Sequence, residues 1–460
     1  MRNALRALAG LILCSISIYY FLYPAVTVLN QIREESPAQS GVSDFAADIH
    51  RSIAQPFGAW ARDRVETARG TELSLGDISG TEWPMFSAVY FLWSTEELDK
   101  AWVAAGDTGS PRPGIYAADA IEAAAELVVD PANASWVIRH WGESYLEREN
   151  IFYRMLLIAG LTSYQSITGK VQYEPLLRQQ VISLSRELDQ SPHGLLDDYP
   201  GQCYPIDILP AIAVMQRAAA LLEIDLGKFT ERARRGFEGR MLDPATQLPS
   251  YVADPLEGIG IGPARGVGIS YKLIWAKELW PETAKAWYGL YERQFVQQGT
   301  FISGVREFRK GMDAYSWLGD VDSGPILGGF GVAASAFGIA AARVNGDAAL
   351  AHGLSTQAIL AAWPLPSGRL LVPSLLSDLS DAPFLGETAL MFVFSRPMNL
   401  PDTPAELAPA ELAPAELAIA ELSTPKLVYI LLAIALSLGL LILFLGLRLI
   451  LSTARRHRSA

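Results

Sequence analysis

The sequence contains few of the side chains from which metal sites and covalent catalytic centres are built. Only two cysteines and five histidines occur among its 460 residues. Cys14 falls in an apolar run and Cys203 stands alone in the rest of the chain, so no disulfide within a folded domain is expected. The histidines lack the paired spacing of zinc ligands, so we predict no metal. Phosphate-binding loops and serine nucleophile elbows are also absent, which argues against nucleotide hydrolysis and serine-hydrolase chemistry.

Positive charge is also scarce away from the ends of the chain. There are 37 lysines and arginines against 49 aspartates and glutamates, for a net charge of −12. Arginines cluster at the two ends, so the long middle region is more acidic still. Such a surface repels nucleic acid and anionic headgroups, and neither is an expected partner. The terminal arginines are Arg2, Arg6, Arg448, Arg455, Arg456 and Arg458.

Two apolar runs, at residues 8–29 and 427–451, are each longer than the roughly 20 residues that cross a bilayer. Basic residues precede the first run and follow the second. Because positive charge stays in the cytoplasm, we expect residues 1–7 and 452–460 to be cytoplasmic. This predicts an inner (cytoplasmic) membrane protein whose main domain lies on the extracytoplasmic or periplasmic side. A cleaved signal peptide is the alternative for the first run, but its apolar core is long and no clean small-x-small site follows.

Residues 30–400 form the predicted extracytoplasmic domain, and residues 401–426 connect it to the second span. The connection repeats the sequence Pro-Ala-Glu-Leu-Ala from Pro404, Pro409 and Pro414. Proline interrupts a helix, and a period of five residues does not suit a coiled coil. The segment is therefore predicted to be a semi-rigid stalk.

The fold class predicted for the domain is all-α. Apolar residues recur with helical spacing through most of residues 43–398, whereas the alternating pattern of strands is scarce. Short glycine-containing turns alternate with long polar loops, which favours a ring of antiparallel helix pairs with the long loops at one mouth. An elongated helical solenoid is the alternative, although no strict repeat is visible. The expected helices are 44–68, 83–105, 117–129, 150–167, 173–188, 208–222, 228–240, 267–279, 281–297, 328–344, 348–362 and 388–395.

The loop at residues 194–207 is the strongest candidate for chemistry. It holds Asp197, Asp198, Cys203 and Tyr204 between two expected core helices. Polar loops on a rigid helical scaffold commonly carry functional groups. The alternative is a capped helix connection, with Asp207 as the N-cap of the following helix. A cap needs one carboxylate and this loop supplies three, which favours a functional role.

Two earlier loops also precede expected helices. Asp77 could serve as an acid or a base, whereas Glu82 could simply cap the helix that begins at Trp83. Asn150 and Tyr153 lie three residues apart and would share one helix face. An acid-rich first turn that stabilises the helix dipole is the plainer interpretation of the segment before them.

A later region combines charged and aromatic groups. Arg306 could hold an anionic or hydroxylated ligand near Trp317, although an ion pair with Glu307 is the favoured interpretation. Asp320 and Asp322 alternate as at the start of a calcium loop, but the remaining ligand positions are hydrophobic or glycine, which excludes an EF-hand. The two carboxylates are instead a candidate acid–base pair or a helix cap.

Several of these motifs together resemble the linalool dehydratase/isomerase family. The resemblance covers residues 70–345 and implies an (α/α)6 toroid with its site in a central cavity. It also implies cofactor-independent addition or removal of water at a tertiary allylic alcohol by acid–base groups. The motifs are Glu149-Asn150-Ile-Phe-Tyr153, the Thr168-Gly169 turn, Tyr173-Glu174, the Gly194-Leu-Leu run, Asp320-Val-Asp322-Ser-Gly324 and Gly331-Val-Ala-Ala-Ser-Ala-Phe337.

The chain departs from this family at the positions that carry its chemistry. Leu156 stands where the family has a catalytic histidine, and Asp197 and Ile206 stand where it has two cysteines. Cys203 matches the second cysteine only after a short deletion. A family tyrosine falls near Phe86. Carboxylate and leucine in place of thiol and imidazole change which protons the site can move near neutral pH.

The sequence therefore predicts a membrane-anchored acid–base enzyme of the hydro-lyase or isomerase type that uses no cofactor. The alternatives are a glycan-acting (α/α)6 hydrolase or lyase of the cell envelope, and a noncatalytic binding or scaffold module. The expected partner is a small-molecule or glycan ligand, and the oligomeric state is left open. The candidate catalytic residues are Asp77, Asp197, Asp198, Asp320 and Asp322, and the candidate substrate-binding residues are Trp83, Phe86, Asn150, Tyr153, Cys203, Tyr204, Arg306 and Trp317.

Overall fold

The computed structural model is built mainly of helices, as predicted, with apolar helices at both ends of the chain. It describes residues 2–35, 41–72, 78–106, 109–226, 228–312, 319–320, 322–380, 382–399 and 424–458. Strands within these residues pair only as short antiparallel hairpins. The pairs are β1 (Val252–Asp254) with β2 (Ile259–Ile261), β3 (Val296–Gln297) with β4 (Gly304–Val305), and β5 (Ile326–Leu327) with β6 (Phe330–Gly331).

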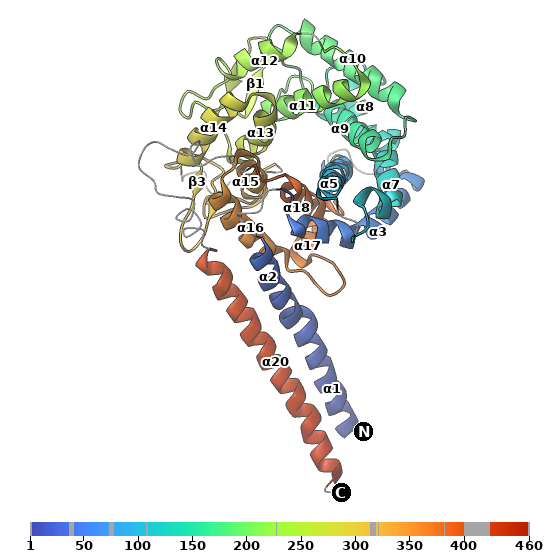
Figure 1. Ribbon diagram of the computed structural model, residues 1–460, viewed down its shortest axis with the longest axis vertical. Coiled ribbons are helices and arrows are strands. Elements are labelled where there is room, and N and C mark those ends of the chain that lie inside the picture. The colour runs from blue at the N-terminus through green and yellow to red at the C-terminus, as the bar shows by residue number, and fades with distance from the viewer. Residues whose placement is uncertain are drawn as a thin grey trace.

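A set of long apolar helices packs together in chain order. In that order, α5 contacts α9, α9 contacts α11, α11 contacts α13, α13 contacts α15, α15 contacts α18, and α18 returns to α5. Figure 1 shows these helices arranged around the middle of the domain. Helices that are apolar all round belong in a core, and every residue of α9 from Ile151 to Tyr164 is buried. The set is α5 (Trp83–Ala105), α9 (Ile151–Thr168), α11 (Pro205–Leu222), α13 (Gly266–Leu279), α15 (Val332–Asn345) and α18 (Leu385–Ser395).

A second set of helices lies outside the first and alternates with it along the chain (Figure 1). Each of α7, α10 and α14 packs on two consecutive inner helices. Outer helices bury one face, as α10 does with Leu177, Val181, Leu184 and Leu188, which recur every three or four residues. The set is α3 (Asp44–Glu66), α7 (Ala118–Val129), α10 (Glu174–Gln190), α12 (Phe229–Phe237), α14 (Pro281–Gln294) and α16 (Ala348–Ala362).

The helix predicted from residue 328 begins later than expected. Gly328 and Gly329 have φ of 60° and 90° and form the tight turn between β5 and β6, so α15 starts only at Val332. The helices α8 (Ser135–Trp141) and α17 (Leu371–Leu379) were not predicted. Shorter elements complete the fold: α4 (Ile78–Thr81), α6 (Pro113–Tyr116) and the 3₁₀ turns η2 (Arg69–Thr71) and η3 (Pro131–Ala134).

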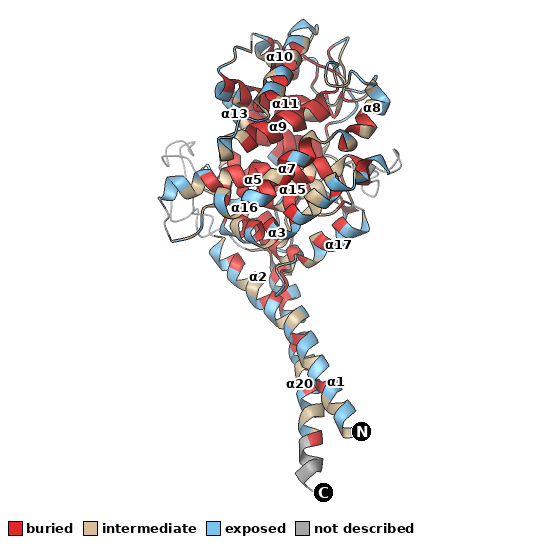
Figure 2. Cartoon of the chain, turned by 90° about the vertical axis from the view of Figure 1, so that its right-hand side faces the viewer, coloured by how far each residue is buried: buried red, intermediate tan, exposed pale blue. Residues whose placement is uncertain are grey.

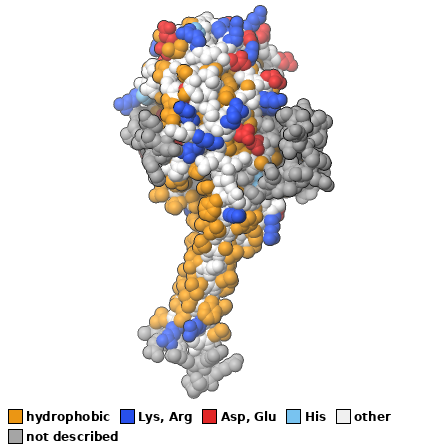
Figure 3. Space-filling view, turned by 90° about the vertical axis from the view of Figure 1, so that its left-hand side faces the viewer, with side chains coloured by type: hydrophobic (Ala, Val, Ile, Leu, Met, Phe, Trp, Pro, Cys, Tyr) orange, Lys and Arg blue, Asp and Glu red, His pale blue; other side chains and the backbone are white. Residues whose placement is uncertain are grey.

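Long apolar helices from the two ends of the chain lie side by side below the domain (Figures 1 and 2). Apolar side chains cover the surface of this terminal helix pair (Figure 3). A further helix that is apolar enough to cross a membrane, α11, is instead packed inside the domain. The pair consists of α1 (Arg2–Ser17), the π-helical segment η1 (Ile18–Leu22) and α2 (Tyr23–Glu34) on one side, and α20 (Lys426–Arg458) on the other.

Small residues bring the two sides of the terminal helix pair together. A Cβ atom at Gly446 would lie 2.8 Å from the carbonyl oxygen of Gly10, so only glycine permits this approach. The hydroxyl of Ser17 donates to the carbonyl of Gly439 at 2.6 Å. These contacts fix the antiparallel register of the pair.

Polar contacts attach the terminal helix pair to the domain. Arg343, near the end of the inner helix α15, donates to Glu35 just beyond α2 at 2.8 Å. At the start of α20, the backbone N–H of Lys426 donates to the carbonyl of Thr300 at 2.9 Å. The predicted stalk lies almost entirely outside the described residues, which resume at Thr424.

Candidate functional site

The loop at residues 194–207 folds back on itself immediately before α11. The N–H of Asp198 donates to the carbonyl of Gln202 at 2.8 Å, and the N–H of Tyr204 donates to Oδ2 of Asp198 at 2.7 Å. This turn buries Asp198, which is 1% exposed. Burial, followed by repulsion from Asp207, raises the pKa of Asp198 well above its usual value.

Asp207 lies in the first turn of α11. The helix begins at Pro205 with Tyr204 as its N-cap, so the alternative interpretation, in which Asp207 is the N-cap, is wrong. The half-buried carboxyl group of Asp207 has no hydrogen-bond partner among the described residues. Burial, and then repulsion from Asp322, raise the pKa of Asp207 to about 8, while the charge of Lys272 acts in the opposite direction.

Glu82 immediately precedes α5. Its side chain makes no capping hydrogen bond and instead accepts one from the hydroxyl of Tyr199 at 2.8 Å. Burial is the main cause that raises the pKa of Glu82 to about 7; the Tyr199 hydroxyl lowers it and the charge of Asp322 raises it. The interpretation of Glu82 as a simple helix cap is therefore wrong.

Asp322 lies in the turn before β5. Its Oδ2 accepts a hydrogen bond from the hydroxyl of Tyr251 at 2.7 Å, although the residue is exposed. Desolvation raises the pKa of Asp322, the Tyr251 hydroxyl lowers it, and Asp320 raises it. Tyr251 in turn lies under the guanidinium of Arg265, whose Cζ is 4.5 Å from the ring centroid.

Glu82, Asp207 and Asp322 come from separate parts of the chain and act on one another's ionisation. Asp322 raises the pKa of both other carboxyls, and Glu82 raises that of Asp207. We call these three residues the carboxyl cluster. Neighbouring carboxyls with raised pKa values can hold and exchange protons near neutral pH. The arrangement is suited to acid–base chemistry.

An aromatic layer lies close to the carboxyl cluster, and we call it the aromatic floor. It consists of Tyr90, Tyr271, Phe337 and Phe392, one from each of four inner helices. The rings of Tyr271 and Phe337 are 4.9 Å apart, and those of Tyr90 and Phe392 are 4.8 Å apart. After burial, the charge of Asp207 is among the causes that raise the pKa of both tyrosines, which places the floor near that carboxyl.

Arg265 organises the turn that carries Asp322. It donates to Oδ2 of Asp320 at 2.6 Å and to Oε1 of the fully buried Glu307 at 2.7 Å. The predicted ion pair between Arg306 and Glu307 is therefore wrong, because Arg265 is the cation that Glu307 binds. The Arg265 and Ser323 hydrogen bonds outweigh desolvation and lower the pKa of Asp320 to about 2, so this carboxylate stays ionised and serves to hold Arg265.

Lys272 is the cation beside Asp207. It is 1% exposed and donates to the carbonyls of Pro249 and Ser250 at 3.2 and 3.1 Å. Burial lowers the pKa of Lys272 to about 7, and the charge of Asp207 raises it. Lys272 thus opposes the rise in the pKa of Asp207 without forming a direct ion pair with it among the described contacts.

We expect Lys272→Met to raise the pKa of Asp207, because the variant removes the charge that lowers it. Infrared titration of the Asp207 carboxyl band should show its loss at a higher pH than in the wild-type protein. Lys100→Met is the matched control, because Lys100 pairs with Glu96 and has no part in the carboxyl cluster. An unchanged titration in Lys272→Met, with a cooperative melting transition retained, would rule out this role.

The other candidates from the 194–207 loop are Asp197, Cys203 and Tyr204, and their contacts lie mainly with the loop and its neighbours. The N–H of Asp197 donates to Glu149 at 2.8 Å, and Oδ2 of Asp197 accepts from the N–H of Gly201 at 2.7 Å. Cys203 is 1% exposed, and burial followed by the charge of Asp198 raises its thiol pKa, so it is a poor nucleophile. Tyr204 is half-buried with its ring 5.9 Å from that of Tyr251.

Candidates on α5 and α9 lie in the packed wall of the domain. Phe86 is half-buried, 5.1 Å from the ring of Phe152. Tyr153 is buried against Trp136 and Tyr145. Buried Asn150 adopts a left-handed conformation with φ of 48°.

The remaining candidates are not part of the carboxyl cluster or cannot be placed. Trp83 is half-buried in the first turn of α5. Arg306 donates to the side chain of Gln297 at 3.4 Å. Asp77 and Trp317 lie outside the described residues.

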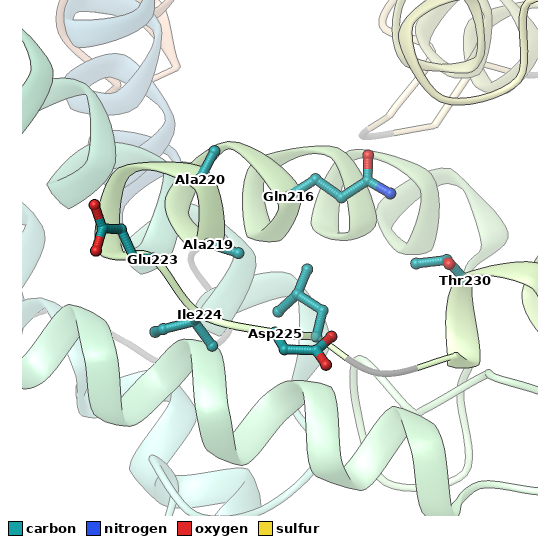
Figure 4. Close-up of a pocket in the computed structure, with 8 residues that line it drawn as sticks. Gln216, Ala219, Ala220, Glu223, Ile224, Asp225 and Thr230 are labelled. Carbon is teal, nitrogen blue, oxygen red and sulfur yellow. The ribbon is translucent and has the colours of Figure 1, made fainter.

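In the described part of the chain, no group of histidine, cysteine and carboxylate side chains is placed to hold a metal ion. The pocket in Figure 4, about 450 Å³ in volume, lies where α11 ends, with Gln216, Glu223, Asp225 and Thr230 among its lining residues. Asp207 is in the first turn of the same helix, so this pocket belongs to the opposite end of α11.

Comparison of the chain with models of known protein families and with curated protein sequences found no match.

Proposed function

We propose that the domain is an (α/α)6 toroid held on the extracytoplasmic face of the cytoplasmic membrane by α1–α2 and α20. The order of packing that returns from α18 to α5, with outer helices alternating along the chain, supports the toroid. The two ends of the chain lie at the same end of the terminal helix pair (Figure 1), and both are rich in arginine. Positive charge at that end supports a cytoplasmic location for it.

The function that we favour is cofactor-independent acid–base catalysis on a small, largely apolar alcohol, by loss or addition of water or by isomerisation. The observation that carries this proposal is the carboxyl cluster beside the aromatic floor. Asp207 has a raised pKa, lacks a hydrogen-bond partner among the described residues and is repelled by Asp322, which are properties of a proton donor more than of a structural carboxylate. The resemblance to the linalool dehydratase/isomerase family supports the same reaction class, with carboxyls in place of its imidazole and thiols.

In the proposed elimination, the protonated carboxyl of Asp207 donates its proton to the substrate hydroxyl. The C–O bond breaks, water leaves, and the allylic cation that remains lies over the aromatic floor, whose ring faces attract positive charge. Asp322, held by Tyr251, accepts a proton from the adjacent carbon, and the electron pair of that C–H bond forms the new double bond. Proton exchange with solvent then restores Asp207 and Asp322. Hydration follows the same steps in reverse.

This function is tested by incubating purified full-length protein with linalool and other acyclic tertiary allylic alcohols in water enriched in ¹⁸O. We expect diene products and ¹⁸O incorporation into recovered alcohol, both lost in Asp322→Asn and retained in the control Asp48→Asn, whose exposed carboxylate pairs with Arg51. Cleavage of cell-envelope glycans that is lost in Asp322→Asn would favour the glycan-acting alternative. Absence of turnover of either class, with ligand binding unchanged in Asp322→Asn, would favour a scaffold.

A further inference from the structure

The short helix α17 exposes its apolar face and buries its polar face. One face of the helix carries the apolar residues Val372, Leu375, Leu376 and Leu379, at positions i, i+3, i+4 and i+7. All four are exposed. The polar face points into the protein instead: the hydroxyls of Ser374 and Ser377 are buried and donate to the carboxylate of Glu387 at 2.6 and 2.9 Å. In a water-soluble helix the apolar face would be the buried one.

This orientation has a substantial cost in water. An exposed leucine forgoes the roughly 1.5–3 kcal/mol that burial of such a side chain contributes. Leu379, which is 76% exposed, shows how little of the apolar face the protein itself covers. The buried serine–carboxylate contacts prevent α17 from rolling over, because that would leave Glu387 without its hydrogen bonds. The apolar face must therefore be covered by something outside the described residues.

The position of α17 identifies what covers it. Figures 1 and 2 both show α17 at the end of the domain from which the terminal helix pair leaves. Trp363, in the connection between α16 and α17, donates its indole N–H to the carbonyl of Tyr20 at 2.9 Å. Tyr20 lies about nine residues, or roughly 13 Å of helix, from the outer end of the predicted span at residue 29. The segment that leads into α17 therefore contacts the span well inside its apolar length.

We infer that α17 is an interfacial membrane helix, whose apolar face inserts into the outer leaflet beside the terminal helix pair. The inference rests on the proposed membrane anchoring and is independent of the proposed reaction. An amphipathic helix that lies in the plane of the interface is bound by burial of its apolar face among the acyl chains. Such a third contact would fix how the domain is tilted over the bilayer, which the terminal helix pair alone does not.

The experiment uses the full-length protein in lipid nanodiscs, with an environment-sensitive fluorophore attached to one introduced cysteine. Cys14→Ala is the background, and Cys203 is protected by its burial. Labels are placed at Leu376→Cys and Leu379→Cys on α17. Leu441→Cys on α20 is the control for membrane insertion, and Leu256→Cys, an equally exposed leucine in the turn between β1 and β2, is the control for an aqueous surface.

We expect the α17 labels to emit at shorter wavelength and to lose most of their fluorescence when the lipid carries a nitroxide on its acyl chain. The Leu256 label should show neither change. Quenching at Leu441 without quenching on α17 would overturn the inference and leave the membrane anchoring intact. No quenching at Leu441 would overturn both. A blue shift on α17 that nitroxide lipid does not quench would show that protein covers the face, which also contradicts the inference.

Discussion

Asp207→Asn is expected to abolish turnover while making the folded protein more stable. Asparagine keeps the size of the side chain but can neither donate the proton that leaves with the hydroxyl nor recover it from solvent. Loss of a general acid costs on the order of 10²–10⁴ in rate. A rate that falls less than about tenfold would contradict the assignment of Asp207 as the proton donor.

The stability change should depend on pH in a defined direction. The folded-state pKa of Asp207, about 8, lies above the ordinary aspartate value. The protonated Asp207 carboxyl therefore contributes its full stabilisation below the unfolded-state pKa of about 3.9. This stabilisation is lost as the pH rises through the folded-state pKa. Asparagine does not ionise, so the Asp207→Asn variant does not lose stability in this way as the pH rises. The free energy of unfolding of Asp207→Asn should exceed that of the wild-type protein by an amount that grows between pH 5 and pH 9. At pH 9 we expect this difference to be about 2 kcal/mol or more, with a higher melting temperature.

Asp48→Asn is the control for this stability measurement, since Asp48 is exposed and its pairing with Arg51 is a surface contact. Its difference from the wild-type protein should be small at every pH. A difference for Asp207→Asn that is absent at pH 9, or that shrinks as the pH rises, would show that the Asp207 carboxyl is not destabilised by ionisation.

Arg265→Ala is expected to cause the largest loss of stability. It leaves the fully buried Glu307 without its cation, and removing one partner of a buried ion pair costs about 3–5 kcal/mol. It also removes the group that holds the Asp320 turn and stacks on Tyr251, so Asp322 loses its fixed position and turnover should fall too. The free energy of unfolding from denaturant titration measures the first effect.

The double variant Arg265→Met with Glu307→Gln separates charge from packing. It removes both charges, and the glutamine still accepts the N–H of Val267 that Glu307 binds at 3.2 Å. Most of the lost stability should return. Burial already raises the pKa of Glu307 to about 7 against the opposing charge of Arg265, so without that charge the pKa rises further. Arg265→Ala should therefore be less destabilised at pH 5, where Glu307 is protonated, than at pH 8. An equal loss at both pH values would contradict the buried-charge explanation.

The fold was more predictable from the sequence than the site. Helices such as α5 and α16 begin and end where apolar periodicity, proline and glycine indicate, because these are local signals. Residues 328–331 were predicted helical because glycine among apolar residues does not reveal a hairpin turn. Helix α17 was missed because its burial pattern is inverted, and no local rule indicates which face of a short apolar helix the rest of the protein covers.

The sequence indicated the loops of the candidate site but not the contacts between them. Asp198 and Asp322 were chosen from local clusters of carboxylates. Asp198 influences the ionisation of Cys203 in its own loop, whereas Asp322 influences that of Glu82, which comes from another part of the chain. Glu82 and Asp207 were considered only as possible helix caps, because a carboxylate at a helix start is commonly one. The carboxyl cluster forms only when α5, α11 and the turn before β5 pack together, and local sequence does not indicate this packing. A useful signal was that an acid lies at the start of two inner helices, each after a polar loop.

The most direct test of this account is the protonation state of Asp207 at neutral pH, measured by infrared difference spectroscopy. The spectrum of Asp207→Asn is subtracted from that of the wild-type protein in deuterated buffer across pH 5 to 10. We expect a protonated carboxyl band that persists at pH 7 and disappears with a midpoint near pH 8, as the raised pKa of about 8 requires. A difference spectrum that shows only ionised carboxylate at pH 7 would contradict the central claim that Asp207 is held ready to donate a proton.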